Sequence, residues 1–128
     1  MSYYISKTVA IDFDSAIAAI TASLKEQGFG IITEIDMSAT LKNKIDKDIP
    51  PYKILGACNP GYAYQAVINE PQVGVMLPCN VIVRQVENNQ VEIAAIDPLA
   101  SMMAIENDKL HGFAQEVKDK LTIAVNAV

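Results

Sequence analysis

The first thirty residues change from a strand-like to a helix-like hydrophobic pattern. Residues 3–10 alternate side chains with a period of two, which predicts a β-strand. The next segment repeats apolar side chains at helical spacing, and Asp12 or Asp14 can cap the helix that it predicts. Gly28 can end that helix in the left-handed conformation, with Phe29 as its hydrophobic partner. The helical apolar positions are Phe13, Ile17, Ile20 and Leu24.

The middle of the chain predicts two further strands with a short helix between them. Residues 30–37 and 52–58 are the strands, and Ser38 can cap the helix, which the proline pair 50–51 ends. Strict alternation in the first strand assigns its residues to two faces. One face would carry Ile31, Thr33, Ile35 and Met37, and the other Ile32, Glu34 and Asp36.

The C-terminal half predicts a hairpin flanked by helices. Asn59-Pro60 is a helix start, because proline fits the first helical position, and the helix would cover residues 62–70. Residues 81–86 and 90–96 are strands around Glu87-Asn88-Asn89, since asparagine tolerates positive φ. Asp97-Pro98 opens another short helix. A long final helix carries one apolar stripe: Leu110, Phe113, Ala114, Val117, Leu121, Ala124, Val125 and Val128.

This order of elements predicts an α+β fold. Two long helices with one-sided apolar stripes need a sheet to cover, which gives a two-layer sandwich. We expect one curved, mainly antiparallel sheet with helices on one face, built on a β-α-β4-α core with short extra helices. The length of 128 residues and the 51% hydrophobic content fit a single domain over residues 1–128.

Charge and hydropathy argue against several classes of function. The net charge is −5, and Arg84 is the only arginine, whereas nucleic-acid binders cluster lysine and arginine. No apolar stretch reaches the ~18–20 residues of a membrane span. The N-terminal segment lacks the basic and apolar regions of a signal peptide. We therefore expect a cytoplasmic protein that binds neither nucleic acid nor membrane, with two free thiols.

Cys58 is the position most suggestive of chemistry. It ends a predicted strand just before a helix, and the positive end of a helix favours a thiolate. Cys79 begins another strand without a helix behind it. For both, the more common role is that of a small buried hydrophobe. If the two strand ends converge, these thiols and the amides of Asn59 and Asn80 would line one pocket.

The turn after Cys58 is a candidate cradle for an anion. Free backbone N–H groups at a helix start attract carboxylate or phosphate, which makes Asn59, Gly61 and Tyr62 candidate ligand-binding residues. The more common alternative is that the Asn59 side chain caps those donors itself. Tyr52 and Asn80 are further candidate ligand-binding residues. Tyr52 or Lys53 could also tune the Cys58 thiol, although Lys53 should point to the opposite face of the strand.

The remaining titratable residues have simpler explanations. Glu34 and Asp36 share a strand face, where carboxylates usually keep a sheet soluble. The single histidine, His111, falls opposite the apolar stripe and should face solvent. A zinc site from Cys58, Cys79 and His111 lacks the close-spaced ligand pairs of such sites. We expect neither a metal nor a cofactor.

Several sequence blocks together resemble a known family. Gly30-Ile31-Ile32-Thr33-Glu34-Ile35-Asp36, Gly56-Ala57-Cys58-Asn59-Pro60, Leu77-Pro78-Cys79-Asn80 and Asp97-Pro98 are similar to domain-of-unknown-function family 302, DUF302. The resemblance covers essentially the whole chain. It implies a TATA-binding-protein-like α+β fold and a homodimer, and it supplies no reaction.

Two functions from different classes remain open. The first is a dimeric module that binds a small anionic or thiol ligand, or a protein partner, around residues 58–62. The second is a thiol-dependent redox or sulfur-transfer enzyme in which Cys58 is the nucleophile and Cys79 assists it. We favour the first, because the sequence offers no acid, base or electrostatic partner for catalysis beyond one helix terminus.

Overall fold

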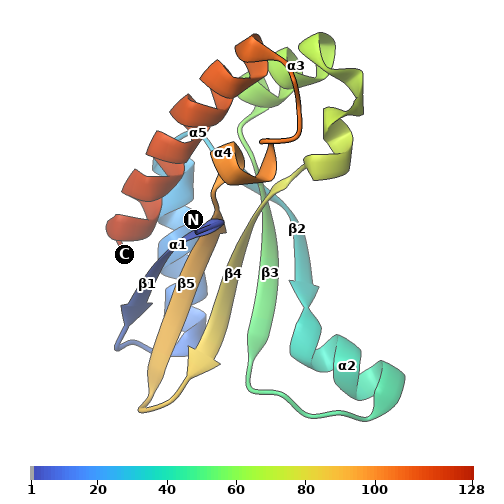
Figure 1. Cartoon of the computed structure of the whole chain (residues 1–128). Helices are drawn as coiled ribbons and strands as arrows, with labels where there is room; N and C mark the ends of the chain where they lie inside the picture. The colour runs from blue at the N-terminus through green and yellow to red at the C-terminus, as the bar shows by residue number, and fades with distance from the viewer. Residues whose placement is uncertain (1) are drawn as a thin grey trace.

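Five strands form one antiparallel sheet, with the order β1-β5-β4-β3-β2. The structure is a computed structural model and describes residues 2–128. Figure 1 shows α1 and α5 lying along one side of the sheet, which confirms the predicted two-layer α+β sandwich. The strands are β1 (Tyr4–Val9), β2 (Gly30–Asp36), β3 (Tyr52–Cys58), β4 (Cys79–Val86) and β5 (Gln90–Ile96). The helices are α1 (Phe13–Glu26), α2 (Met37–Ile45), α3 (Pro60–Asn69), the 3-10 helix η1 (Pro71–Met76), α4 (Pro98–Ser101) and α5 (Asp108–Asn126).

The main core lies between the sheet and the two long helices. Apolar stripes of α1 and α5 meet the alternate residues of β3, β4 and β5 that face them. The predicted stripe of α5 is confirmed in its buried residues. The largest wholly enclosed side chains of this core are Ile20, Leu24, Leu55, Ile93 and Leu121. Among residues 2–128, no helix combines the length and apolar character needed to cross a membrane.

A smaller apolar cluster lies beyond one end of the sheet. It joins α3, η1, α4 and the first turns of α5, which gather at the same end of the molecule in Figure 1. The 3-10 helix η1, which begins at Pro71 directly after α3, is not among the predicted elements. The buried members of this second cluster are Ala66, Val73, Met102, Leu110 and Ala114.

The predicted end of α1 is confirmed in detail. Gly28 has φ +87°, and its N–H donates to Lys25 O at 3.0 Å. The Phe29 N–H donates to Leu24 O at 2.9 Å, and the Phe29 ring is buried in the main core. This pairing satisfies the last carbonyls of the helix and turns the chain into β2. At the other end, Asp12 is the cap, accepting from Ser15 N at 2.8 Å.

Two local predictions in the β2–α2 region are wrong. A β-bulge between Ile31 and Thr33 interrupts the alternation, so Ile31 pairs with Ala57 on the core face while Thr33 pairs with Gly56 on the opposite face. The cap of α2 is also not Ser38. Asp36 accepts from Ala39 N at 2.9 Å, and the Ser38 hydroxyl donates to the same carboxylate.

The hairpin between β4 and β5 is as predicted. Asn88 and Asn89 both adopt positive φ, at +61° and +57°, which suits a tight two-residue turn. The Asp97-Pro98 start of α4 is likewise confirmed, with Asp97 Oδ1 accepting from Leu99 N at 3.0 Å. These turns bring β5 and α4 to the sheet end that carries the second cluster.

We predict that Gly56→Ala destabilises the fold while Gly112→Ala does not. A Cβ on Gly56 would lie 2.1 Å from Thr33 Oγ1 and 2.7 Å from Pro78 Cγ, which forces neighbouring atoms to move. Denaturant unfolding should show a loss of about 1–3 kcal/mol. Gly112 lies in α5 with open space around it, so its alanine variant should gain roughly 0.5–1 kcal/mol. Equal stabilities for the two variants would contradict this packing argument.

Candidate functional site

An apolar cavity lies between the two hydrophobic clusters. Its volume is about 320 Å³, near the lower end of the range of ~300–1,000 Å³ for small-molecule sites. Phe29, Ala57 and Val117 of the main core form part of its wall, and Met102 and Leu110 of the second cluster form another part. The cavity therefore occupies the junction that neither cluster fills.

Small side chains explain why this space is open. Ala57 on β3, Ala63 and Ala66 on α3, and Ala114 on α5 all line the cavity. Each contributes only a methyl group to the wall. Interiors otherwise pack to the density of organic crystals. These small side chains thus leave part of the space between the two clusters open.

The cavity has a buried wall and a partly exposed mouth. Its walls are mostly buried residues of the two clusters, whereas Cys58, Asn59, Tyr62 and Ala63 are half-buried and Ile32 is 61% exposed. Ile32 occupies the β-bulge of β2, so the bulge directs its side chain to the mouth. A ligand would enter beside the junction of β3 and α3.

The two cysteines open onto this same cavity. Cys79 pairs with Ala57, the residue before Cys58, so the two sulfurs come from adjacent strands. Both are free thiols. Burial, together with the nearby Cys58 sulfur, raises the pKa of the Cys79 thiol to about 11. Cys79 is therefore a protonated thiol at neutral pH, while Cys58 is the thiol that solvent reaches.

Asn59 does not cap α3, contrary to the more common alternative considered above. It makes no side-chain capping hydrogen bond, and its Nδ2 instead donates to Gln27 O at 3.3 Å. That bond ties the start of α3 to the end of α1. Consequently, Asn59 leaves the first-turn N–H groups of Gly61 and Tyr62 without a cap. A Cβ on Gly28 would lie 3.0 Å from Asn59 Nδ2, so glycine also permits this contact.

Tyr62 forms part of the mouth between α3 and α5. Its ring packs against the main core and lines the cavity. Loss of solvent, and secondarily the Glu116 carboxylate, raise the pKa of the Tyr62 hydroxyl above its usual value. The residue therefore provides an apolar ring and a neutral hydroxyl at physiological pH.

The structure divides the predicted ligand-binding residues between two places. Asn59 and Tyr62 join both cysteines at the cavity, whereas Gly61 is exposed and does not line it. Tyr52 and Asn80 lie on the opposite, helix-free face of the sheet. They border a shallow hollow there of about 460 Å³, so the predicted pair of amides is not brought together.

That open sheet face combines apolar side chains with one ion pair. Arg84 Nε lies 2.7 Å from Glu92 Oε1 across β4 and β5. The two tyrosines before and within β1 pack edge to face at the other end of this face, where Tyr4 pairs with Ile96, whereas Glu92 pairs with Thr8. The apolar and aromatic residues concerned are Tyr3, Tyr4, Tyr52, Ile82, Ala94 and Ile96.

The two acidic residues of β2 have structural partners. Glu34 Oε1 lies 2.8 Å from Lys53 Nζ, and Asp36 caps α2. The Ala39 N–H and the Ser38 hydroxyl hold the pKa of Asp36 below its usual value. Within residues 2–128, no group of three or more histidine, cysteine, aspartate or glutamate residues is placed to hold a metal ion.

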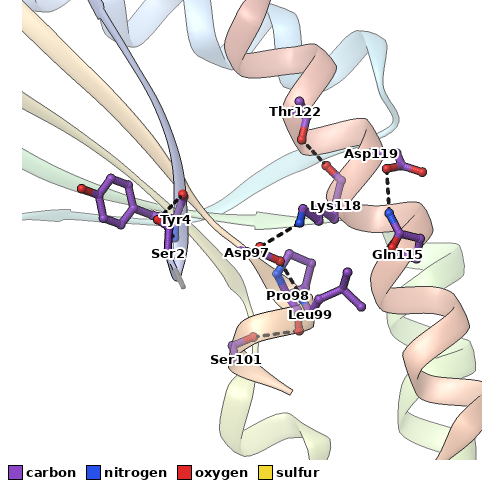
Figure 2. Close-up of polar contacts among 10 residues, drawn as sticks. All are labelled: Ser2, Tyr4, Asp97, Pro98, Leu99, Ser101, Gln115, Lys118, Asp119 and Thr122. Carbon is purple, nitrogen blue, oxygen red and sulfur yellow. Dashed lines mark hydrogen bonds and ion pairs between the residues drawn. The ribbon is translucent and has the colours of Figure 1, made fainter. Parts of the chain in front are cut away.

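The prediction that His111 faces solvent is wrong. Its ring is half-buried, and Nε2 is shielded from solvent without a hydrogen-bond partner among the described residues. The reason is that α4 and the start of β1 approach this side of α5, around a hollow that Lys118 and Asp97 also line. Figure 2 shows the ion pair there, with Lys118 Nζ 3.0 Å from Asp97 Oδ2.

Sequence reasoning missed most of the cavity wall. The wall residues are apolar, and their spacing indicated only core positions. The one available signal was the repeated alanine at Ala57, Ala63, Ala66 and Ala114, which marks thin side chains on three different elements. The missed lining residues are Phe29, Ile32, Ala57, Ala63, Ala66, Leu77, Pro78, Pro98, Met102, Leu110, Phe113, Ala114 and Val117.

We predict that stability falls in alkaline solution because Cys79 keeps its proton more tightly in the folded state. The unfolded thiol ionises near its ordinary pKa of 9.0, and the folded one near 11. Between these values the unfolded state loses a proton that the fold retains, so the free energy of unfolding falls as pH rises, by on the order of 2 kcal/mol.

Urea unfolding from about pH 8 to about pH 11 tests this. Cys79→Ala should lose correspondingly less stability than the wild type over this range. Cys58→Ala should lose nearly as much as the wild type, because burial is the larger cause of the shift. Parallel profiles for the wild type and Cys79→Ala would exclude the proposed cause.

Comparison with known proteins places this architecture in a family. No curated protein matches the chain. The crystal structure of an uncharacterized conserved DUF302 protein from Bacillus stearothermophilus has a TM-score of 0.92 and 24% identity, covering 99% of this chain and 98% of that one. At this identity the likeness establishes the shared fold, and the TATA-binding-protein-like fold stays a prediction. The family model "Domain of unknown function DUF302" matches residues 5–128, so the chain belongs to the DUF302 family.

Proposed function

We propose that this DUF302 protein binds a small molecule with an apolar body and an anionic end. The observation that carries the proposal is the cavity of about 320 Å³ at the junction of the two clusters. Its wall offers apolar contact to nearly the whole of a small ligand, which is the usual character of small-molecule sites. The polar atoms that line it are concentrated at the mouth, on Cys58, Asn59 and Tyr62.

The start of α3 supports an anionic end for the ligand. Asn59 leaves the first-turn N–H groups of this ten-residue helix uncapped, and such groups favour a carboxylate. A medium-chain carboxylate would place its chain among the alanines and its charge at the mouth. The sequence predicted a small anionic or thiol ligand. The apolar wall and the uncapped helix start favour the anionic alternative, with a hydrocarbon body attached to the charge.

The accompanying proposal is a homodimer formed through the open sheet face. Two copies related by a twofold axis would each offer the same apolar face, which also carries Arg84 and Glu92. Opposite charges within one patch make that patch complementary to itself, because each arginine can approach the other copy's glutamate. The cytoplasm is the compartment we propose, since both thiols stay reduced there.

We predict that hexanoate stabilises the protein more than acetate or hexanol does. Hexanoate alone combines chain and charge, so it should raise the melting temperature by several degrees at saturating concentration. Ala63→Phe fills the cavity and should abolish this increase. Ala39→Phe is the matched control, because Ala39 is exposed on α2 away from the cavity. Hexanoate binding that survives in Ala63→Phe would refute the site.

We predict that Ile82→Lys separates the homodimer. Ile82 is half-buried on the open face and lines its hollow, so a lysine pair would place two charges in the interface. Native mass spectrometry should give twice the chain mass for the wild type and the single mass for this variant. Ile123→Lys changes an isoleucine of α5 that is 54% exposed and should remain dimeric. A monomeric wild type would refute the dimer.

A further inference from the structure

The cavity proposed to bind the ligand is lined by an accessible thiol, a reactive group that binding alone does not require. Among its lining residues, nucleophilic side chains are confined to Cys58, Cys79 and Tyr62. Cys79 is buried, and its thiol holds its proton at neutral pH. The Tyr62 hydroxyl is likewise neutral. Cys58 is half-buried at the mouth, so it is the nucleophile that a molecule entering the cavity meets.

The walls select the kind of electrophile that can reach this thiol. They are built from alanine, leucine, methionine, proline, valine and phenylalanine side chains, and no charged residue lines the cavity. An electrophile that carried its charge in among these apolar walls, past the N–H groups at the mouth, would lose its hydration there without gaining a partner. A neutral molecule with a hydrocarbon body instead gains apolar contact as it displaces water. Thiols also react readily with soft carbon electrophiles, of which conjugated carbonyl compounds are the simplest neutral example.

We propose that Cys58 captures small apolar α,β-unsaturated aldehydes and ketones as covalent adducts within this cavity. The inference rests on the proposed function, because it uses the same cavity to hold the hydrocarbon body of the molecule. It goes further by assigning a bond-forming role to one residue and a chemical class to its reactant.

The addition balances without any further reactant. The Cys58 sulfur supplies an electron pair that forms a carbon–sulfur bond to the β-carbon. The π pair of the carbon–carbon double bond moves toward the carbonyl, giving an enolate, and a proton equivalent to the one lost from the thiol then adds to the α-carbon. Nothing leaves, and the adduct contains every atom of both reactants, so neither an oxidant nor a reductant is needed.

Two features of the site favour this step. The cavity holds the electrophile beside the thiol, which converts a bimolecular encounter into a reaction within one complex. The uncapped first turn of α3 starts two residues after Cys58, and its N–H groups favour negative charge such as that of an enolate oxygen. Cys79, on the adjacent strand, remains a protonated thiol and does not compete for the electrophile.

Intact-mass spectrometry with two Michael acceptors tests the proposal. The neutral enone trans-3-octen-2-one has a hydrocarbon body, whereas acrylamide undergoes the same addition without one. Rates are compared with those of glutathione at the same pH. The protein should react with the octenone faster than glutathione does by roughly tenfold or more, and with acrylamide at a rate similar to that of glutathione. Peptide mapping of the wild-type adduct should place the single modification on Cys58.

The variants separate capture in the cavity from simple exposure of a thiol. Cys58→Ala should give no adduct with either reagent. Ala63→Phe should lose that preference and still react with acrylamide, while Ala39→Phe should behave as the wild type. Melting curves establish that each variant is folded. The absence of an octenone preference, an adduct on Cys79, or a preference that survives in Ala63→Phe would overturn the proposal.

The failure of this proposal is distinguishable from failure of the proposed function. If hexanoate stabilises the protein in the Ala63-dependent way described above and the octenone shows no preference, the cavity binds ligands without covalent capture. If neither the stabilisation by hexanoate nor the octenone preference depends on Ala63, both proposals fail. If the octenone preference depends on Ala63 and hexanoate does not bind, the covalent role stands and the anionic end of the ligand is refuted.

Discussion

The burial of one sheet face beneath α1 and α5 is the interaction on which the rest of the structure depends. Side chains such as Ile20, Leu55 and Leu121 are wholly removed from water there. Burial of each such side chain contributes about 1.5–3 kcal/mol, so this layer fixes how the two long helices lie on the strands. Every feature of the candidate site takes its position from that arrangement, because β3, β4 and α5 each contribute both to the core and to the cavity.

The cavity lies where the packing of helices on the sheet meets the second apolar cluster. At one end of the sheet the chain forms α3, η1 and α4, which make their own apolar cluster with the start of α5. Two clusters that share a long helix meet along a seam, and four alanines leave that seam unfilled. The same alanines would give a tighter and more stable core if they were larger. A small molecule that fills the seam therefore supplies contacts that the protein itself lacks.

The thiols differ because the sheet end exposes them differently. Cys79 is the first residue of β4 and is buried in the main core, where burial raises its pKa and keeps it protonated. Cys58 is the last residue of β3, at the point where the chain leaves the sheet for α3. The residue after Cys58 also leaves a helix end uncapped. The Asn59 amide donates to the end of α1 and so does not cap the start of α3. One buried and one accessible thiol on neighbouring strands thus follow from how each side chain is packed and not from residue type.

The sequence by itself determined the fold class and the helices and strands other than η1. The signals that predicted them are local, and the backbone adopts the conformations that they indicate. They are the period-two and helical patterns, the Gly28-Phe29 end of α1, the paired asparagines of the hairpin and the Asp97-Pro98 start of α4. Family-specific blocks around both cysteines also predicted the DUF302 family, which the family model confirms. Strand ends and a helix start also singled out Cys58, Asn59, Tyr62 and Cys79 among the residues that line the candidate site.

Only the tertiary structure decided what those residues do together. The bulge at Ile31–Thr33 depends on the pairing of β2 with β3, and the partner of Asn59 is a carbonyl 32 positions away in the chain. His111 is shielded by elements that no helical pattern in α5 can reveal. The cavity is the space that remains where the surrounding elements enclose more volume than their side chains fill. It forms only when segments that are distant in the sequence pack together, so an alanine that lines a cavity cannot be told from any other alanine in the sequence.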